Sequence, residues 1–154
     1  MGKEGSLNMG QAVFEKTINN LPVIAEKEKW VPSYDKDLDF LYWTKYPLSN
    51  NCKLVKVSHE TSLYINAKKE VEGVLVEYLV GNFISHNPSL KGITKQFNKE
   101  LGNGMYTVVS NKDTKKLFSK LGEGLRADIY QDATKVKGGV NYDVLVNLAV
   151  NKSL

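Results

Sequence analysis

The chain has 154 residues, of which 42% are hydrophobic, 25% charged and 10% aromatic, and its formal net charge is +4. This length suits a single domain, and these fractions are those of an ordinary globular chain, which argues against global disorder, collagen-like repeats and a coiled coil. No apolar stretch approaches the roughly 20 residues that cross a bilayer and no signal-peptide pattern opens the sequence, so we expect a cytoplasmic protein without a membrane partner.

The N-terminal part of the sequence predicts an extension followed by an interrupted helix. Residues 1–8 are small and polar, and we expect them to be a flexible extension of a single α+β domain over residues 9–154. From Met9 the apolar residues recur at helical spacing. Because proline breaks a helix, Pro22 predicts an interruption and a restart that carries the helix on to Ala25.

The next part of the chain is dense in aromatic and β-branched residues and predicts a β-meander. The expected elements are turn formers at 33–37, a strand at 38–44, a loop at 46–51, and strands at 54–58 and 62–66. Residues 71–85 fit both a helical and a strand pattern. Four valines and Gly73 favour a strand, which would end near Gly81 and Asn82.

Two amphipathic helices are predicted in the middle of the chain, separated by a strand at 106–109. The first covers residues 88–101, begins at Pro88 and carries an apolar stripe. The second covers residues 111–121. Four glycines are interpreted as the ends of these helices: Gly102, Gly104, Gly122 and Gly124.

The last part of the chain predicts a β-hairpin. Between Val140 and Val150, apolar residues alternate with polar ones, as in a strand with one buried face. Residues 125–131 are the expected partner strand. The predicted fold is therefore α+β, with an antiparallel β-meander sheet, flanking amphipathic helices and a C-terminal β-hairpin.

One pattern in the strand region resembles a known family. It consists of the runs Ser33-Tyr34-Asp35 and Val71-Glu72-Gly73-Val74, with Asp39, Leu41 and Tyr42 between them. Over residues 33–80 the chain resembles a family of small bacterial and archaeal β-meander domains of unknown function. The resemblance implies a meander for this segment and supplies no catalytic or binding residue.

The positive charge is concentrated in residues 91–120, whose net charge is +5, and all but one of the basic residues of the chain are lysines. Lysines are point charges that suit phosphates, whereas arginines make the bidentate contacts that read bases. We therefore expect a non-catalytic binding or interaction protein that contacts a polyanion, either a nucleic acid backbone or an acidic protein surface. The alternative is that these lysines form a solvated surface. The expected contact residues are Lys91, Lys95 and Lys99, spaced four apart on the first helix, and Lys112, Lys115, Lys116 and Lys120 on the second.

Three titratable residues carry an alternative, enzymatic hypothesis. His59, Glu60 and His86 lie near the ends of predicted strands, and a meander would bring them to one end of the sheet as acid–base groups of a small hydrolase or nuclease. Nothing in the sequence resembles a motif that activates a nucleophile, so a non-enzyme is favoured. A homo-oligomeric structural protein that pairs through a strand edge is a further alternative.

The sequence predicts no metal site and no cofactor. Cys52 is the one cysteine of the chain, so soft metal ligands are scarce. Asp35, Asp37 and Asp39 alternate as in a calcium loop, but a phenylalanine holds the position of the required glycine and a tyrosine that of the bidentate glutamate. We therefore interpret these aspartates as part of a turn.

Overall fold

The computed structural model describes residues 15–109 and 111–135. In these ranges no helix is long and apolar enough to cross a membrane. Residues 15–19 are helical. The other elements are α2 (Leu21–Lys27), β1 (Val31–Asp35), β2 (Phe40–Thr44), β3 (Lys53–Lys56), β4 (Thr61–Ile65), β5 (Val71–Glu77), the 3-10 turns η1 (Phe83–His86), η2 (Pro88–Leu90) and η3 (Ile93–Gln96), β6 (Lys99–Gly102), β7 (Met105–Thr107) and α3 (Lys112–Lys135).

The strands form one antiparallel sheet in the order β3-β4-β5-β2-β1-β7-β6. β3, β4 and β5 follow one another as a meander, and β5 then pairs with β2. Strands β2 to β5 therefore have the order of a Greek key. The α+β class and the antiparallel, meander-like sheet are confirmed, and β5 shows that the ambiguous segment after Val71 begins as a strand.

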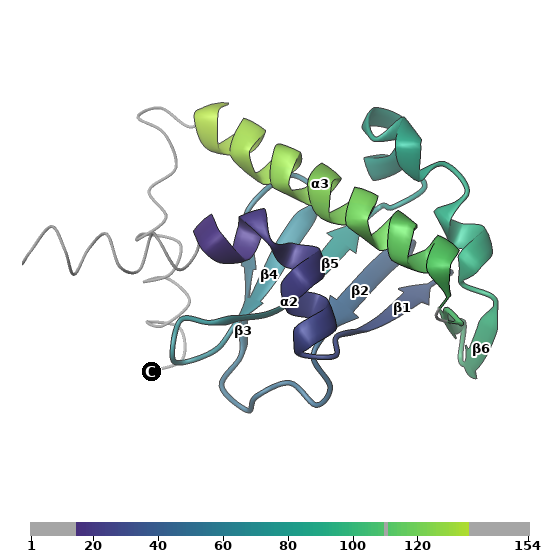
Figure 1. Ribbon diagram of the computed structural model, residues 1–154, viewed down its shortest axis with the longest axis horizontal. Helices are drawn as coiled ribbons and strands as arrows, with labels where there is room; N and C mark the ends of the chain where they lie inside the picture. Colours follow the sequence, from purple (N-terminus) through teal and green to yellow (C-terminus); the bar gives the residue numbers. More distant parts are fainter. Residues whose placement is uncertain (1–14, 110, 136–154) are drawn as a thin grey trace, which may run out of the picture.

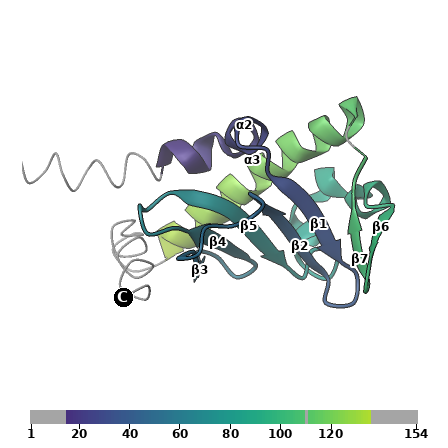
Figure 2. The same cartoon turned by 90° about the horizontal axis from the view of Figure 1, so that it is seen from below.

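Both helices lie on the same face of the sheet (Figures 1 and 2). In Figure 1, α3 crosses the sheet from the side of β6 to that of β4. On β2, the alternation of side chains places Leu41 and Trp43 in the core, where they are 0% and 5% exposed. Phe40 and Tyr42, on the opposite face of the same strand, are half-buried. The hydrophobic core therefore lies between the sheet and the two helices.

The N-terminal helix is interrupted where the sequence predicts it. Residues 15–19 are helical, Asn20 is not, and α2 restarts at Leu21 with Pro22 in its first turn. A proline fits this position because the first turn of a helix has no partner for its N–H groups.

The C-terminal helix is longer than predicted. α3 continues through Gly122 to Lys135, so the strand predicted at 125–131 is wrong, and its predicted partner at 140–150 lies outside the described residues. Leu125 and Ile129 are 0% and 1% exposed and lie one helical turn apart. Burial of this apolar face against the sheet outweighs the low helix propensity of glycine, about 1 kcal/mol per residue.

Gly122 is a packing position within α3. A Cβ atom at this position would lie 2.5 Å from Cγ of Pro22. Only glycine leaves room for the proline ring, so α2 and α3 approach closely at this point. The interpretation of Gly122 as a helix terminator is therefore wrong.

The helix predicted at 88–101 is also wrong. This stretch consists of η2, η3 and the start of β6, and Gly92 between the two turns has a φ of 91° that no helix accommodates. Ile93 and Phe97 are buried as predicted, but Leu101 is 55% exposed on β6. The buried apolar residues of this stretch therefore fill the core individually and do not form one apolar face of a helix.

The turn formers predicted before the first strand contain a strand of their own. β1 pairs with β2 as a hairpin, and the aspartates stabilise its turn. Asp35 accepts hydrogen bonds from the backbone N–H groups of Asp37 and Leu38 at 3.0 and 3.1 Å. Asp39 accepts one from the hydroxyl of Tyr34 at 2.6 Å. These contacts give Asp35 and Asp39 a structural role in the turn.

A buried glutamate joins the loop after β2 to β5. Glu72 is 2% exposed and accepts hydrogen bonds from the backbone N–H of Ser49 at 2.9 Å and from the amide of Asn66 at 2.7 Å. Burial alone would raise the pKa of Glu72, but the hydrogen bonds from Ser49 and Asn66 outweigh it and lower the pKa to about 2. The ionised carboxylate therefore stabilises the fold.

Glu72→Gln should lower the free energy of unfolding at neutral pH by on the order of 2 kcal/mol, because the amide loses the charge-assisted hydrogen bonds. The pKa of Glu72 lies below its ordinary value of 4.5. Its contribution to the free energy of unfolding is therefore complete above pH 4.5 and is lost as the pH falls towards 2. Urea unfolding between pH 7 and pH 2.5 measures both effects. Glu123→Gln, at an exposed position of α3, is the control, and an equal loss in both variants would contradict the role of Glu72.

Candidate functional site

Glu60, His86 and Asp128 come together from three separate parts of the chain. Glu60 precedes β4, His86 ends η1, and Asp128 lies on α3. Nε2 of His86 is 3.2 Å from the carboxylate of Glu60 and 3.5 Å from Oδ2 of Asp128. In the part of the chain that the structure describes, these residues form a group whose ligand atoms all lie within 4.8 Å of one another.

The backbone around Glu60 fixes its position. The turn from β3 to β4 is closed by hydrogen bonds from the N–H groups of Val57 and Ser58 to the carbonyl of Thr61. The carbonyl of Glu60 accepts a further bond from the N–H of Glu77 at 2.7 Å, which attaches the turn to the end of β5. The side chain of Glu60 therefore projects from a rigid site.

A second glycine of α3 brings η1 close enough for His86 to reach the helix. Gly124 lies one turn before Asp128, and a Cβ atom there would lie 2.7 Å from Oδ1 of Asn87 and 3.5 Å from Cζ of Phe83. Asn87 is itself fixed, since its amide donates to the carbonyl of Phe83 at 3.1 Å. Gly124 is thus a point of close approach between α3 and η1, and its interpretation as a helix terminator is wrong.

The two carboxylates of the group differ in their hydrogen bonding. Glu60 is 4% exposed, and the amide of Asn82 donates to its Oε1. Asp128 is 9% exposed, and its buried Oδ2 accepts no hydrogen bond from the residues that the structure describes, although it forms an ion pair with His86. Burial, together with the adjacent Glu60 carboxyl, raises the pKa of Asp128 to about 6, although His86 lowers this pKa in part. Asp128 is therefore a buried carboxyl that interacts with Glu60 and His86 and has one oxygen, Oδ2, 3.5 Å from the imidazole nitrogen.

The enzymatic hypothesis named two residues of this group. Glu60 and His86 lie within hydrogen-bond distance, as that hypothesis requires. His59 is exposed and is not a member of the group. Asp128 was missed because it lies in the segment predicted as a strand. The continuation of the apolar spacing through Leu125 and Ile129 is the signal that would have placed it on a helix.

The seven predicted contact lysines are exposed, but only one of the two sets lies on a helix. Lys91 follows η2, Lys95 lies in η3 and Lys99 opens β6, so the predicted row of three on one helix face does not form. The other four lie on α3, where Lys112, Lys116 and Lys120 are spaced by one turn each and Lys115 lies beside them.

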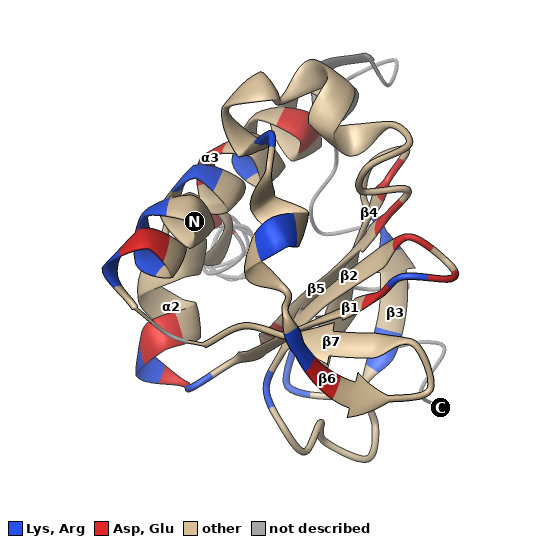
Figure 3. Cartoon of the chain, turned by 90° about the vertical axis from the view of Figure 1, so that its right-hand side faces the viewer, with Lys and Arg blue, Asp and Glu red and all other residues tan. Residues whose placement is uncertain are grey.

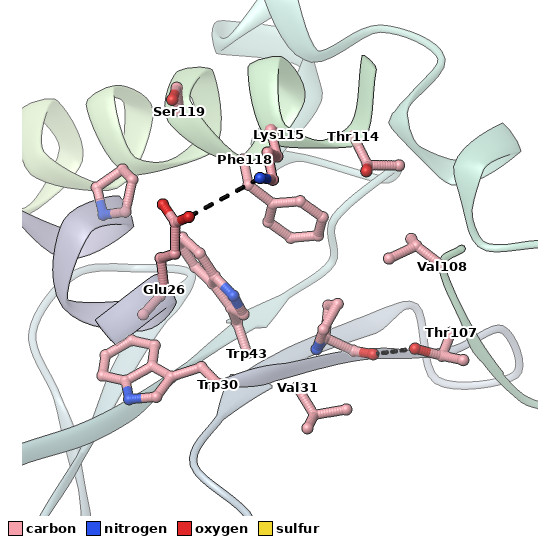
Figure 4. A pocket seen from close by; sticks show the side chains of 13 residues that line it. Glu26, Trp30, Val31, Trp43, Thr107, Val108, Thr114, Lys115, Phe118 and Ser119 are labelled. Carbon is pink, nitrogen blue, oxygen red and sulfur yellow. Dashed lines mark hydrogen bonds and ion pairs between the residues drawn. The ribbon is translucent and has the colours of Figure 1, made fainter. Parts of the chain in front are cut away.

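A cavity of about 350 Å³ lies between α2, α3 and β1 (Figure 4). Its walls include both tryptophans of the chain, Trp30 and Trp43, whose rings meet edge to face with centroids 5.7 Å apart, and Phe118. At the rim, Lys115 and Glu26 form an ion pair at 3.8 Å. Because these two charges are matched to each other, the cavity suits a neutral apolar group.

Comparisons with known proteins do not identify a relative. No family model, curated protein or solved structure matches the chain. What the protein does has therefore to be inferred from its own side chains.

Gly124→Ala should destabilise the protein by about 1–3 kcal/mol, because the added methyl group would lie 2.7 Å from Oδ1 of Asn87 and displace this side chain from its hydrogen bond with Phe83. Alanine in an unobstructed helix would instead stabilise by about 1 kcal/mol. Urea unfolding gives the sign, and the NMR chemical shift of the His86 ring reports its separation from Asp128. Ser119→Ala, at an exposed position of α3, is the control. A gain in stability with an unchanged His86 shift would show that η1 does not depend on this contact.

Proposed function

We propose that this protein binds a nucleic acid backbone and that α3 carries the main contact surface. The observation behind the proposal is the row formed by Lys112, Lys116 and Lys120, called here the lysine row. All three side chains are exposed on one long helix. With a rise of about 1.5 Å per residue, their attachment points are about 6 Å apart along one side of α3.

Like charges at this spacing repel one another. Each such pair destabilises a helix by about 0.2–0.5 kcal/mol, and a bound polyanion removes this repulsion. Lys115 differs from the lysine row because it is paired with Glu26 at 3.8 Å. A bound phosphate backbone would therefore remove more charge repulsion at the lysine row than elsewhere on α3.

The remaining lysines extend the same surface. Figure 3 shows basic segments along α3, before β6 and at the start of β6 on the side of the molecule that faces the viewer. Residues 91–120 hold seven lysines and two acidic residues. A surface of point charges of this kind contacts phosphates and gives little base specificity.

A cavity between β1, η3 and β7 supports single-stranded over double-stranded nucleic acid. It has a volume of about 370 Å³, and its lining includes Lys36 and Lys95 together with the rings of Phe97 and Tyr106. Two lysines and the half-buried ring of Tyr106 in one cavity suit an unpaired base with its phosphate. A stacked duplex does not present such a base.

The test is a fluorescence-anisotropy titration of labelled single-stranded DNA, duplex DNA and RNA at about 50 and 200 mM salt. The triple variant Lys112→Gln, Lys116→Gln, Lys120→Gln should bind at least tenfold more weakly at the lower salt concentration. Because each phosphate contact contributes about one unit to the slope of log K against log salt, the slope should fall by about two to three.

The matched control is the triple variant Lys27→Gln, Lys53→Gln, Lys68→Gln, which removes the same charge from other parts of the surface. Equal losses in the two variants would assign binding to net charge and contradict a site on α3. Absence of binding at low salt would end the nucleic-acid proposal. Binding to polyglutamate alone would identify an acidic protein as the partner.

A small hydrolase or nuclease is the second candidate function, favoured by the contact between Glu60 and His86. A carboxylate 3.2 Å from an imidazole nitrogen orients the ring, which is half of an acid–base pair. The exposed side of His86 leaves its ring open to a substrate, since 43% of the side chain is accessible.

Turnover of a fluorogenic oligonucleotide and of p-nitrophenyl phosphate tests this candidate. If the group is catalytic, His86→Ala and Glu60→Gln should each lose about a hundredfold in kcat/KM while circular dichroism remains native. His59→Ala should retain activity, since His59 lies outside the group. Undetectable turnover by the unmodified protein would leave the binding function as the sole proposal.

A further inference from the structure

We propose that Glu60, His86 and Asp128 bind a divalent cation of the zinc class. Their geometry, burial and unused ligand atoms carry this inference, which is independent of the lysine row. It assigns the group a bound ion, whether or not the protein acts on a substrate.

The distances from His86 to the two carboxylates are close to those between ligands of a metal site. Two ligands bound at about 2.0–2.1 Å to a tetrahedral zinc ion lie about 3.3 Å from each other. Nε2 of His86 is 3.2 Å from the carboxylate oxygens of Glu60 and 3.5 Å from Oδ2 of Asp128. All three ligand atoms lie within 4.8 Å of one another, so the two carboxylates would move towards each other to bind one ion at about 2.0–2.1 Å.

Each residue has a ligand atom available. The amide of Asn82 donates to Oε1 of Glu60, which orients the carboxylate so that both of its oxygens lie 3.2 Å from Nε2 of His86. Oδ2 of Asp128 is buried, accepts no hydrogen bond within the described part of the chain and lies 3.5 Å from the same imidazole nitrogen. A buried oxygen without a partner is costly in a folded protein, and a bound cation satisfies it.

The negative charges of the two carboxylates also favour the binding of a cation. Glu60 and Asp128 are 4% and 9% exposed, and one histidine faces both of them. Two carboxylates within a few ångströms repel one another, and a single imidazole N–H can donate to only one oxygen at a time. A divalent ion interacts with both carboxylates and with the imidazole nitrogen simultaneously.

The site is accessible to an ion from solvent. His86 lies at the surface with 43% of its side chain exposed, whereas the two carboxylates lie beneath it. Three protein ligands leave a fourth position for water, as in zinc sites that are not purely structural. One imidazole with two carboxylates suits zinc and its transition-metal neighbours, whereas magnesium prefers oxygen ligands in an octahedron.

Binding of an ion should raise the stability of the folded protein. The three ligands come from the turn before β4, from η1 and from α3, so an ion links segments that are far apart in sequence. An ion that binds the folded state alone stabilises it by mass action. At about a hundred times the dissociation constant, Tm should rise by about 5–10 °C for a chain of this size.

The experiment uses the full chain, freed of metal with EDTA and dialysed, with zinc chloride as the probe. Isothermal titration calorimetry should give one zinc ion per chain, and thermal unfolding should show the rise in Tm. Magnesium chloride at the same concentration should produce neither effect. His86→Ala and Asp128→Asn should each weaken zinc binding at least tenfold, whereas His59→Ala should change it less than threefold.

Asp128→Asn separates a metal ligand from a structural residue. Without metal, this variant should be at least as stable as the unmodified protein, because it replaces a buried carboxyl by a neutral amide of the same shape. With zinc, it should lose most of the rise in Tm. If His86→Ala fails to fold, Glu60→Gln serves as the second ligand variant.

Three outcomes would overturn the proposal. The first is no zinc binding by the folded, unmodified protein at 1 mM zinc, a concentration on the order of the dissociation constant of a very weak site. The second is unchanged binding in Asp128→Asn and His86→Ala. The third is an equal loss in His59→Ala, which would identify an adventitious surface histidine site. Loss of zinc binding in the lysine-row variant is not expected, so this proposal and the nucleic-acid proposal fail separately.

Discussion

The close packing of α3 against its neighbours is the constraint on which the rest of the structure depends. Gly122 gives room to Pro22 of α2, and Gly124 gives room to Asn87 beside η1. With a larger side chain at either position, the helix would have to move away from the segment that it touches. Because α3 is held at this distance, its apolar side covers the sheet, its lysine row faces solvent, and Asp128 reaches His86.

Two buried carboxylates show how the same burial leads to different roles. Glu72 accepts hydrogen bonds from Ser49 and Asn66, and its pKa is lowered to about 2. Asp128 has a buried oxygen that accepts no hydrogen bond among the described residues, and its pKa is raised to about 6. A carboxylate whose oxygens accept several hydrogen bonds contributes to stability, whereas Asp128, beside Glu60 and His86, is the residue that we propose as a metal ligand.

α3 also keeps the two proposed functions apart. The lysine row occupies the first half of the helix and faces solvent, and Asp128 lies in the second half on the buried side. A nucleic acid on the exposed side does not need the ion, and the ion does not need the lysines. The helix is nevertheless shared, so an ion that links α3 to η1 and to the turn before β4 would make the lysine-bearing helix more rigid.

The sequence by itself determined the elements whose signal is local. The β-branched residues of 71–77 predicted β5, Pro22 predicted the break before α2, and the composition of 91–120 located the excess of lysines. It also singled out Glu60 and His86 as residue types capable of acid–base chemistry. Only the tertiary structure decided that Gly122 and Gly124 continue a helix, that 88–101 does not form one, and that Asp128 joins His86. The reason is physical: a glycine that ends an isolated helix becomes a contact point when another segment packs against it, and no local pattern records that neighbour.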